Sequence, residues 1–143
     1  MTGLIKHYKT NNKKEIEGVE ITFPEAENVD GTVPTFIISR MGSANKAYTK
    51  ELDIATKPYR RHIQVGAMKE EVAESIFIEV FVNTVLKGWK HVQDADGIDI
   101  PFTKQTAISL LNELPDVYKR LMKESQEIGN FRDAGLEDDS KNS

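Results

Sequence analysis

The chain has 143 residues, with 19 Lys and Arg against 23 Asp and Glu, and it contains no cysteine. This length is typical of one domain with its own core, and the lack of cysteine excludes a disulfide scaffold, a cysteine nucleophile and a cysteine-ligated metal. The mildly acidic total argues against a nucleic-acid-binding protein, whose affinity depends on clustered positive charge. The first residues lack the apolar stretch of a secretion signal, so export is not expected.

The N-terminal third predicts a basic arm followed by two strands. Residues 1–14 carry four lysines and few apolar side chains, which indicates a flexible, solvated arm. From Val19 to Phe23 apolar and polar residues alternate, as in a strand with one buried face. Residues 35–40 are β-branched and aromatic and predict a second strand. The two strands are expected to pair as a hairpin with a long, turn-rich loop.

Two helices are expected in the middle of the chain. Ser43 is the candidate N-cap of the first, which should end before Pro58. The second is expected over about residues 68–92 and is apolar on almost all sides. Such a helix is either central in its own domain or covered by another chain. Its most apolar run, residues 76–86, is only 11 residues long, whereas a membrane-spanning helix needs roughly 18 or more.

The C-terminal third predicts a turn and two further helices. Residues 94–99 are expected to form a tight turn rather than a calcium-binding loop, because their acidic side chains lack the spacing that such a loop needs. Thr103 can cap the next helix, Pro115 should interrupt or restart it, and Gly129 is the expected left-handed C-cap. The acidic residues 133–143 are expected to be disordered. The sequence therefore predicts an α+β, helix-dominated single domain over residues 15–132, with an N-terminal β-strand pair and about four helices.

No pattern in the chain indicates an enzyme. The histidines His7, His62 and His91 are scattered, and the nucleophile elbow, the phosphate-binding loop and the dinucleotide fingerprint are all missing from the sequence. We therefore expect no catalytic residue, no cofactor and no metal.

Four residues are candidates for protein binding. Arg60 and Arg61 belong to a basic corner with Lys57 and His62, which would bind phosphate or an acidic partner, or would simply be a solvated helix end. Trp89 would be an interface anchor or a core residue. Phe81, on the apolar helix, is the fourth candidate.

One combination of motifs resembles a known family. The motifs, in order, are Phe36, Arg40-Met41-Gly42, Asn45-Lys46-Ala47-Tyr48, Pro58-Tyr59-Arg60-Arg61, Gly88-Trp89, Asp96-Gly97, Pro101-Phe102-Thr103 and Asn130-Phe131-Arg132. Each motif alone is weak, but their order and spacing over about residues 36–132 resemble the tail assembly chaperones of long-tailed, siphovirus-type bacteriophages.

The resemblance implies a non-enzymatic assembly factor. Such chaperones bind the tape measure protein, keep it soluble and help tail-tube protein assemble around it in the host cytoplasm, and they are typically absent from the finished virion. Many are also made in a longer form by a −1 ribosomal frameshift. Ser140-Lys141-Asn142 is compatible with a slip site, although this tripeptide is also common by chance.

Two other classes of function remain open. One is a structural minor tail protein or head–tail junction protein that is retained in the virion. The other is a small enzyme or regulator without a visible reaction centre. An apolar helix larger than a small core needs also favours either self-association or client binding.

Overall fold

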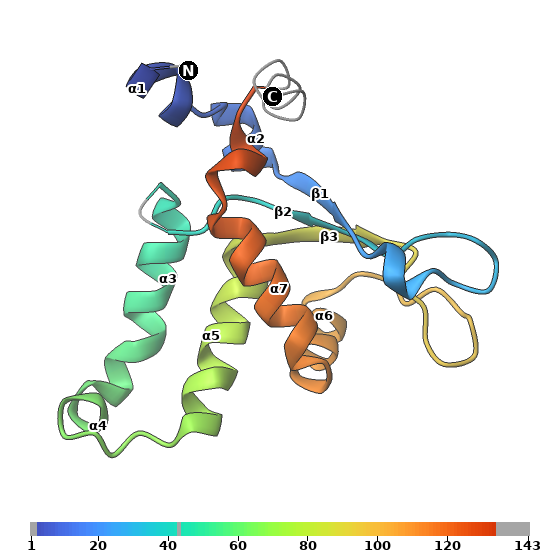
Figure 1. Ribbon diagram of the computed structural model, residues 1–143. Coiled ribbons are helices and arrows are strands. Elements are labelled where there is room, and N and C mark those ends of the chain that lie inside the picture. Colours follow the sequence, from blue (N-terminus) through green and yellow to red (C-terminus); the bar gives the residue numbers. More distant parts are fainter. Residues whose placement is uncertain (1–2, 43, 134–143) are drawn as a thin grey trace.

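The computed structural model describes residues 3–42 and 44–133. Its fold is mixed and helix-dominated, as expected from the sequence (Figure 1). The α-helices in the described part are α1 (Gly3–Tyr8), α2 (Asn12–Glu17), α3 (Lys46–Thr56), α4 (Arg60–Gln64), α5 (Glu70–Thr84), α6 (Lys104–Glu113) and α7 (Pro115–Gln126). The strands are β1 (Val19–Thr22), β2 (Thr35–Ile38) and β3 (Leu86–Lys90), and short 3-10 turns are η1 (Pro24–Ala26), η2 (Lys57–Tyr59) and η3 (Ile128–Phe131).

The three strands form one antiparallel sheet in the order β1-β2-β3. The period-two segment and the β-branched segment pair as the expected hairpin, with Ile21 opposite Phe36. Phe36 also lies opposite Trp89 of β3, so these three residues form a row across the sheet. Alternate residues of a strand share one face, and this row supplies large apolar side chains to the face on which the helices pack.

The core lies between this sheet and the helices α5, α6 and α7. Helix α5 runs between α3 on one side and α6 and α7 on the other (Figure 1). Its residues Ile78 and Phe81 pack with Leu111 of α6 and Leu121 of α7, and all four are at most 1% exposed. Of the two alternatives expected for the apolar helix, central in its own domain or covered by another chain, the first therefore holds for the second half of α5.

The prediction of where the apolar helix ends is wrong. The helix ends at Thr84, and residues 86–90, expected to be helical, form strand β3 instead. The physical reason is the free edge of β2, whose backbone N–H and C=O groups pair with those of β3. Hydrophobic periodicity within one segment cannot detect such a pairing, because the partner strand lies about 50 residues earlier in the chain.

The helix ends confirm some expected caps and correct others. Ser43 lies outside the described residues, and α3 is capped by Asn45, whose side chain accepts a hydrogen bond from the N–H of Tyr48. The cap at Thr103 and the restart at Pro115 are confirmed. Gly129 is not a left-handed cap, because α7 passes at Glu127 into η3, whose last residue, Phe131, is fully buried.

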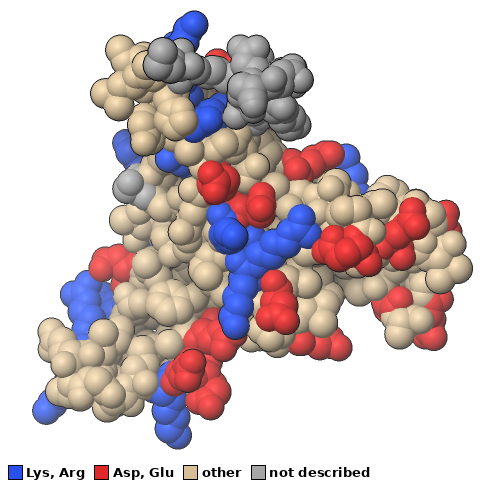
Figure 2. Space-filling view, in the orientation of Figure 1, with Lys and Arg blue, Asp and Glu red and all other residues tan. Residues whose placement is uncertain are grey.

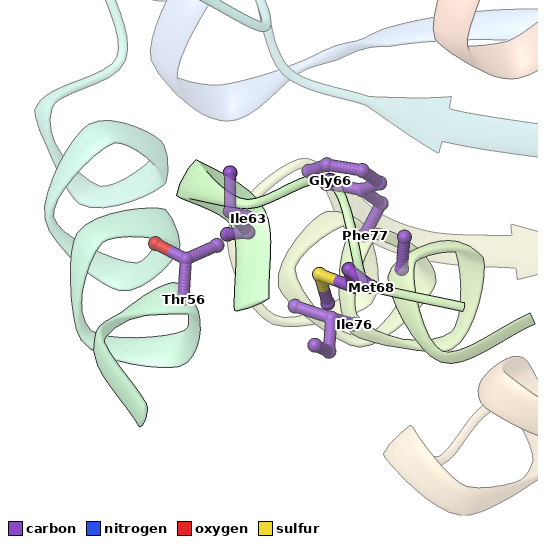
Figure 3. A pocket seen from close by; sticks show the side chains of 7 residues that line it. Thr56, Ile63, Gly66, Met68, Ile76 and Phe77 are labelled. Atoms are coloured by element: carbon purple, nitrogen blue, oxygen red, sulfur yellow. The ribbon is translucent and has the colours of Figure 1, made fainter. Parts of the chain in front are cut away.

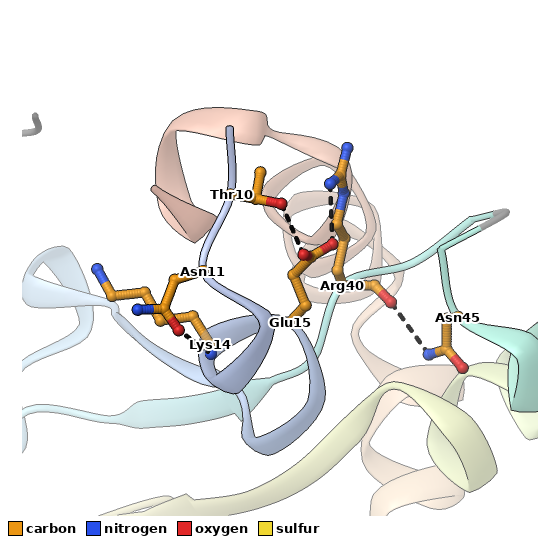
Figure 4. Close-up of polar contacts among 6 residues, drawn as sticks. All are labelled: Thr10, Asn11, Lys14, Glu15, Arg40 and Asn45. Atoms are coloured by element: carbon orange, nitrogen blue, oxygen red, sulfur yellow. Dashed lines mark hydrogen bonds and ion pairs between the residues drawn. The ribbon is translucent and has the colours of Figure 1, made fainter. Parts of the chain in front are cut away.

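The N-terminal residues, expected to be a flexible arm, contain two short helices. The segment is attached at α2: the N–H of Asn11 donates to the Phe131 carbonyl at 2.7 Å, and Glu15 pairs with Arg40 at 2.9 Å. Figure 4 shows the Glu15 carboxylate between Thr10 and Arg40. The expected acidic tail after Asp133, with its candidate slip site, lies outside the described residues.

Candidate protein-binding surface

Helices α3 and α5 form a helical hairpin that projects away from the sheet, with α4 at its tip (Figure 1). We call residues 52–77 the hairpin end. None of them is buried, and the buried residues of α5 begin only at Ile78. The segment is nevertheless rich in large apolar side chains, namely Leu52, Ile54, Tyr59, Ile63, Val65, Met68, Val72, Ile76 and Phe77.

Several of these apolar side chains are largely exposed to solvent. Ile54 is 55% exposed, Ile63 is 47%, Val65 is 70% and Phe77 is 42%. Single exposed apolar residues need no explanation, but a group of them on one projecting element is typical of an interaction surface. In Figure 2 the visible face of the tip, at lower left, is largely uncharged.

A pocket of about 270 Å³ opens between the two sides of the hairpin end. Thr56 lies at the end of α3, Ile63 on α4, and Ile76 and Phe77 on the first half of α5 (Figure 3). Met68, from the loop before α5, completes the apolar lining. Apolar side chains around an open pocket can receive an apolar side chain of a partner, as in the grooves that bind amphipathic helices.

The basic corner lies beside this pocket. Arg60 pairs with Asp53 at 2.8 Å, and more than half of each side chain is exposed. Lys57 and Arg61 are exposed and have no ion pair among the described residues. An exposed pair contributes little to stability, so these cations remain free to meet acidic groups of a partner.

Phe81 lies in the core rather than on a binding surface. It is 0% exposed and meets the ring of Tyr118 edge-on, with 5.4 Å between the ring centroids. The pKa of Tyr118 is raised to about 12, chiefly because burial disfavours its charged form, with smaller contributions from Tyr48 and Glu74. A partner could contact Phe81 only if the core opened.

Trp89 is also held within the domain. Its ring lies edge-on between those of Phe36 and Phe102, with centroid distances of 5.8 and 5.0 Å. Its Nε1–H donates to the Ile100 carbonyl at 2.7 Å. Of its two expected alternatives, interface anchor or core residue, this environment is that of a core residue, because its polar group is already paired inside the chain.

The structure therefore separates the four sequence candidates. Arg60 and Arg61 lie on the exposed hairpin end, whereas Phe81 is fully buried and Trp89 is half-buried against the core. Sequence reasoning missed Phe77, which lies one turn before Phe81 on the same helix. Phe77 is part of the apolar pattern that predicts the helix. No local signal in the sequence shows which turns of that helix are buried in the core and which are exposed.

The acidic and histidine side chains of the described residues do not cluster into a metal site. No group of three or more His, Asp and Glu side chains within residues 3–42 and 44–133 could hold a metal ion. The Asp94 carboxylate instead closes its own turn by accepting the N–H groups of Asp96 and Ile98, so the predicted turn is confirmed. Over the same residues, no helix has both the length and the apolar content needed to cross a membrane.

These features define an α+β domain with an open, apolar helical hairpin. Residues 43–142, more than half of the chain, match the family described as YdaY prophage protein, and the chain belongs to that family. It is therefore a protein of bacteriophage origin. No curated protein and no solved structure matches the chain.

Proposed function

We propose that this prophage protein is a non-enzymatic tail assembly chaperone that binds the tape measure protein through the hairpin end. The observation that carries the proposal is the apolar surface of residues 52–77, which the chain itself covers only in part. Membership in a prophage family and the resemblance of residues 36–132 to tail assembly chaperones support the same function.

The hairpin end has the properties that a helical client would need. Tape measure proteins are long and largely helical, and an amphipathic helix buries its apolar stripe most readily against another apolar helical surface. The pocket between Ile63 and Phe77 would take one apolar side chain of such a stripe, and Lys57, Arg60 and Arg61 would meet acidic residues beside it. The proposed binding takes place in the host cytoplasm, before the tail-tube protein assembles on the client.

Co-expression with the tape measure protein of the same prophage tests this function. The wild-type chain should increase the soluble fraction of the tape measure protein, and the variant Ile63→Ser/Phe77→Ser should lose most of that effect. Ile98→Ser is the matched control, because Ile98 is 63% exposed but lies on the turn after β3, outside the hairpin end. Equal solubility with and without the wild-type chain, or full activity of the double variant, would contradict the proposal.

Purified virions separate the chaperone from a structural tail or junction protein. Mass spectrometry should find a chaperone missing or far below the copy number of tail proteins. A copy number that matches a complete ring would instead identify a virion component.

A further inference from the structure

The two sides of the helical hairpin carry opposite charge. Residues 46–61, which run along α3 to the start of α4, hold five Lys and Arg against two Asp and Glu. Helix α5, residues 70–84, holds four Glu and no Lys or Arg. The α3 side of the hairpin therefore carries a net positive charge and the α5 side a net negative charge.

The opposite charges do not neutralise each other within the chain. Among the described residues, Lys57 and Arg61 on the basic side make no ion pair with Glu70 or Glu74 on the acidic side. The ion pair that does form at the hairpin end, between Arg60 and Asp53, lies within the basic side itself. The charged groups of both the basic side and the acidic side are therefore available to a partner.

The acidic groups also stand beside the apolar pocket. Glu70 and Glu74 lie three residues before Ala73 and Phe77, which line the pocket, and residues three apart are neighbours on a helix surface. On the other side Lys57 follows the lining residue Thr56. The pocket thus has a cationic border on the side of α3 and an anionic border on the side of α5.

This arrangement is self-complementary. In a two-fold symmetric interface each patch of one subunit meets a different patch of the other, and the second contact repeats the first. Two hairpins that pack antiparallel around such an axis would place the basic side of each against the acidic side of the other, as in an antiparallel four-helix arrangement. The same packing would cover the apolar residues of both hairpin ends.

We propose that two copies of this chain pack hairpin end to hairpin end around a two-fold axis, with residues 46–61 of each copy against α5 of the other. The dimer goes beyond the proposed chaperone function and does not depend on it, because self-association is measured with the purified chain alone. If both hold, the second copy covers the surface that a client later occupies, and the two compete.

Charge reversal on one side at a time tests the dimer. Light scattering coupled to size exclusion should give the mass of a dimer for the wild type. Lys57→Glu/Arg61→Glu should give monomers, and so should Glu70→Lys/Glu74→Lys, because like charges would face each other twice in each homodimer. We expect the dissociation constant of each variant to rise by roughly tenfold or more.

Mixing the two variants is the decisive measurement. Their charges are complementary, so an equimolar mixture should form a heterodimer, and one chain carrying all four substitutions should dimerise again. Lys119→Glu/Lys123→Glu on α7 is the control with the same change in net charge as Lys57→Glu/Arg61→Glu, and it should remain a dimer. Circular dichroism confirms that each variant is folded.

Several results would overturn the proposal. A wild-type monomer across the micromolar range would do so, as would a dimer that persists in both reversed variants. Two folded variants that remain monomeric when mixed would show that the opposite charges do not meet across an interface. A species larger than a dimer would replace the two-fold arrangement by another symmetry.

Discussion

The division of α5 into a core half and an open half predicts very different costs for two phenylalanines one turn apart. Phe81 is 0% exposed, and replacing a fully buried Phe by Ala costs about 3–5 kcal/mol. Phe77 is 42% exposed, so slightly more than half of its burial energy of about 1.5–3 kcal/mol is at stake, or about 1–2 kcal/mol. Since domains are stable by only about 5–15 kcal/mol, the difference is measurable.

Urea unfolding followed by circular dichroism gives the comparison directly. The free energy of unfolding should fall by about 2–3 kcal/mol more in Phe81→Ala than in Phe77→Ala, given the burial costs of the two sites. Phe81→Leu keeps part of the packing and serves if the alanine variant is too unstable to measure. Equal costs at the two positions, or a larger cost at Phe77, would refute the reasoning, because the hairpin end would then be packed as tightly as the core.

Three further predictions concern the framework of the domain. The pKa of Tyr118 is raised from 10.0 to about 12, so as the pH rises the hydroxyl loses its proton in the unfolded chain before it does so in the folded chain. The free energy of unfolding should therefore fall by about 2–3 kcal/mol between pH 10 and pH 12. Urea unfolding measured across this pH range should show the fall, and Tyr118→Phe should remove it. Thr103→Ala removes the cap in which the Thr103 side chain accepts the Thr106 N–H at 3.0 Å; thermal unfolding should show a loss of about 1 kcal/mol that Thr103→Ser largely avoids. Trp89→Phe leaves the Ile100 carbonyl without its donor and should cost about 1–3 kcal/mol in urea unfolding, whereas no loss would mean that water replaces the donor.

Features that depend on neighbouring residues could be predicted from the sequence. The alternation from Val19 to Phe23, the cap at Thr103 and the restart at Pro115 each involve groups within a few residues, so their physical causes are visible in a short segment. The fold class follows from such local patterns because each element shows its own period.

Features that depend on distant residues could not be predicted. Strand β3 exists because β2 offers a free edge, and its five residues follow directly on a helix whose apolar pattern hides the change. The apolar helix was expected to be either central or covered by another chain, and its two halves differ in this respect. Residues 78–84 supply the buried side chains of α5, whereas none of residues 70–77 is buried, because α6 and α7 do not cover that half of the helix.

The family match begins at residue 43, but the folded unit does not. Strands β1 and β2 lie before that residue and supply Ile21 and Phe36 to the core, and without β2 the strand β3 would lose its pairing partner. The earlier residues thus belong to the framework on which the matched region folds. Within the described part of the matched region, residues 78–131 contribute all of the buried side chains, whereas residues 52–77 contribute none. The hairpin end is therefore the part of the family region that the core leaves free, and this is why we place binding there.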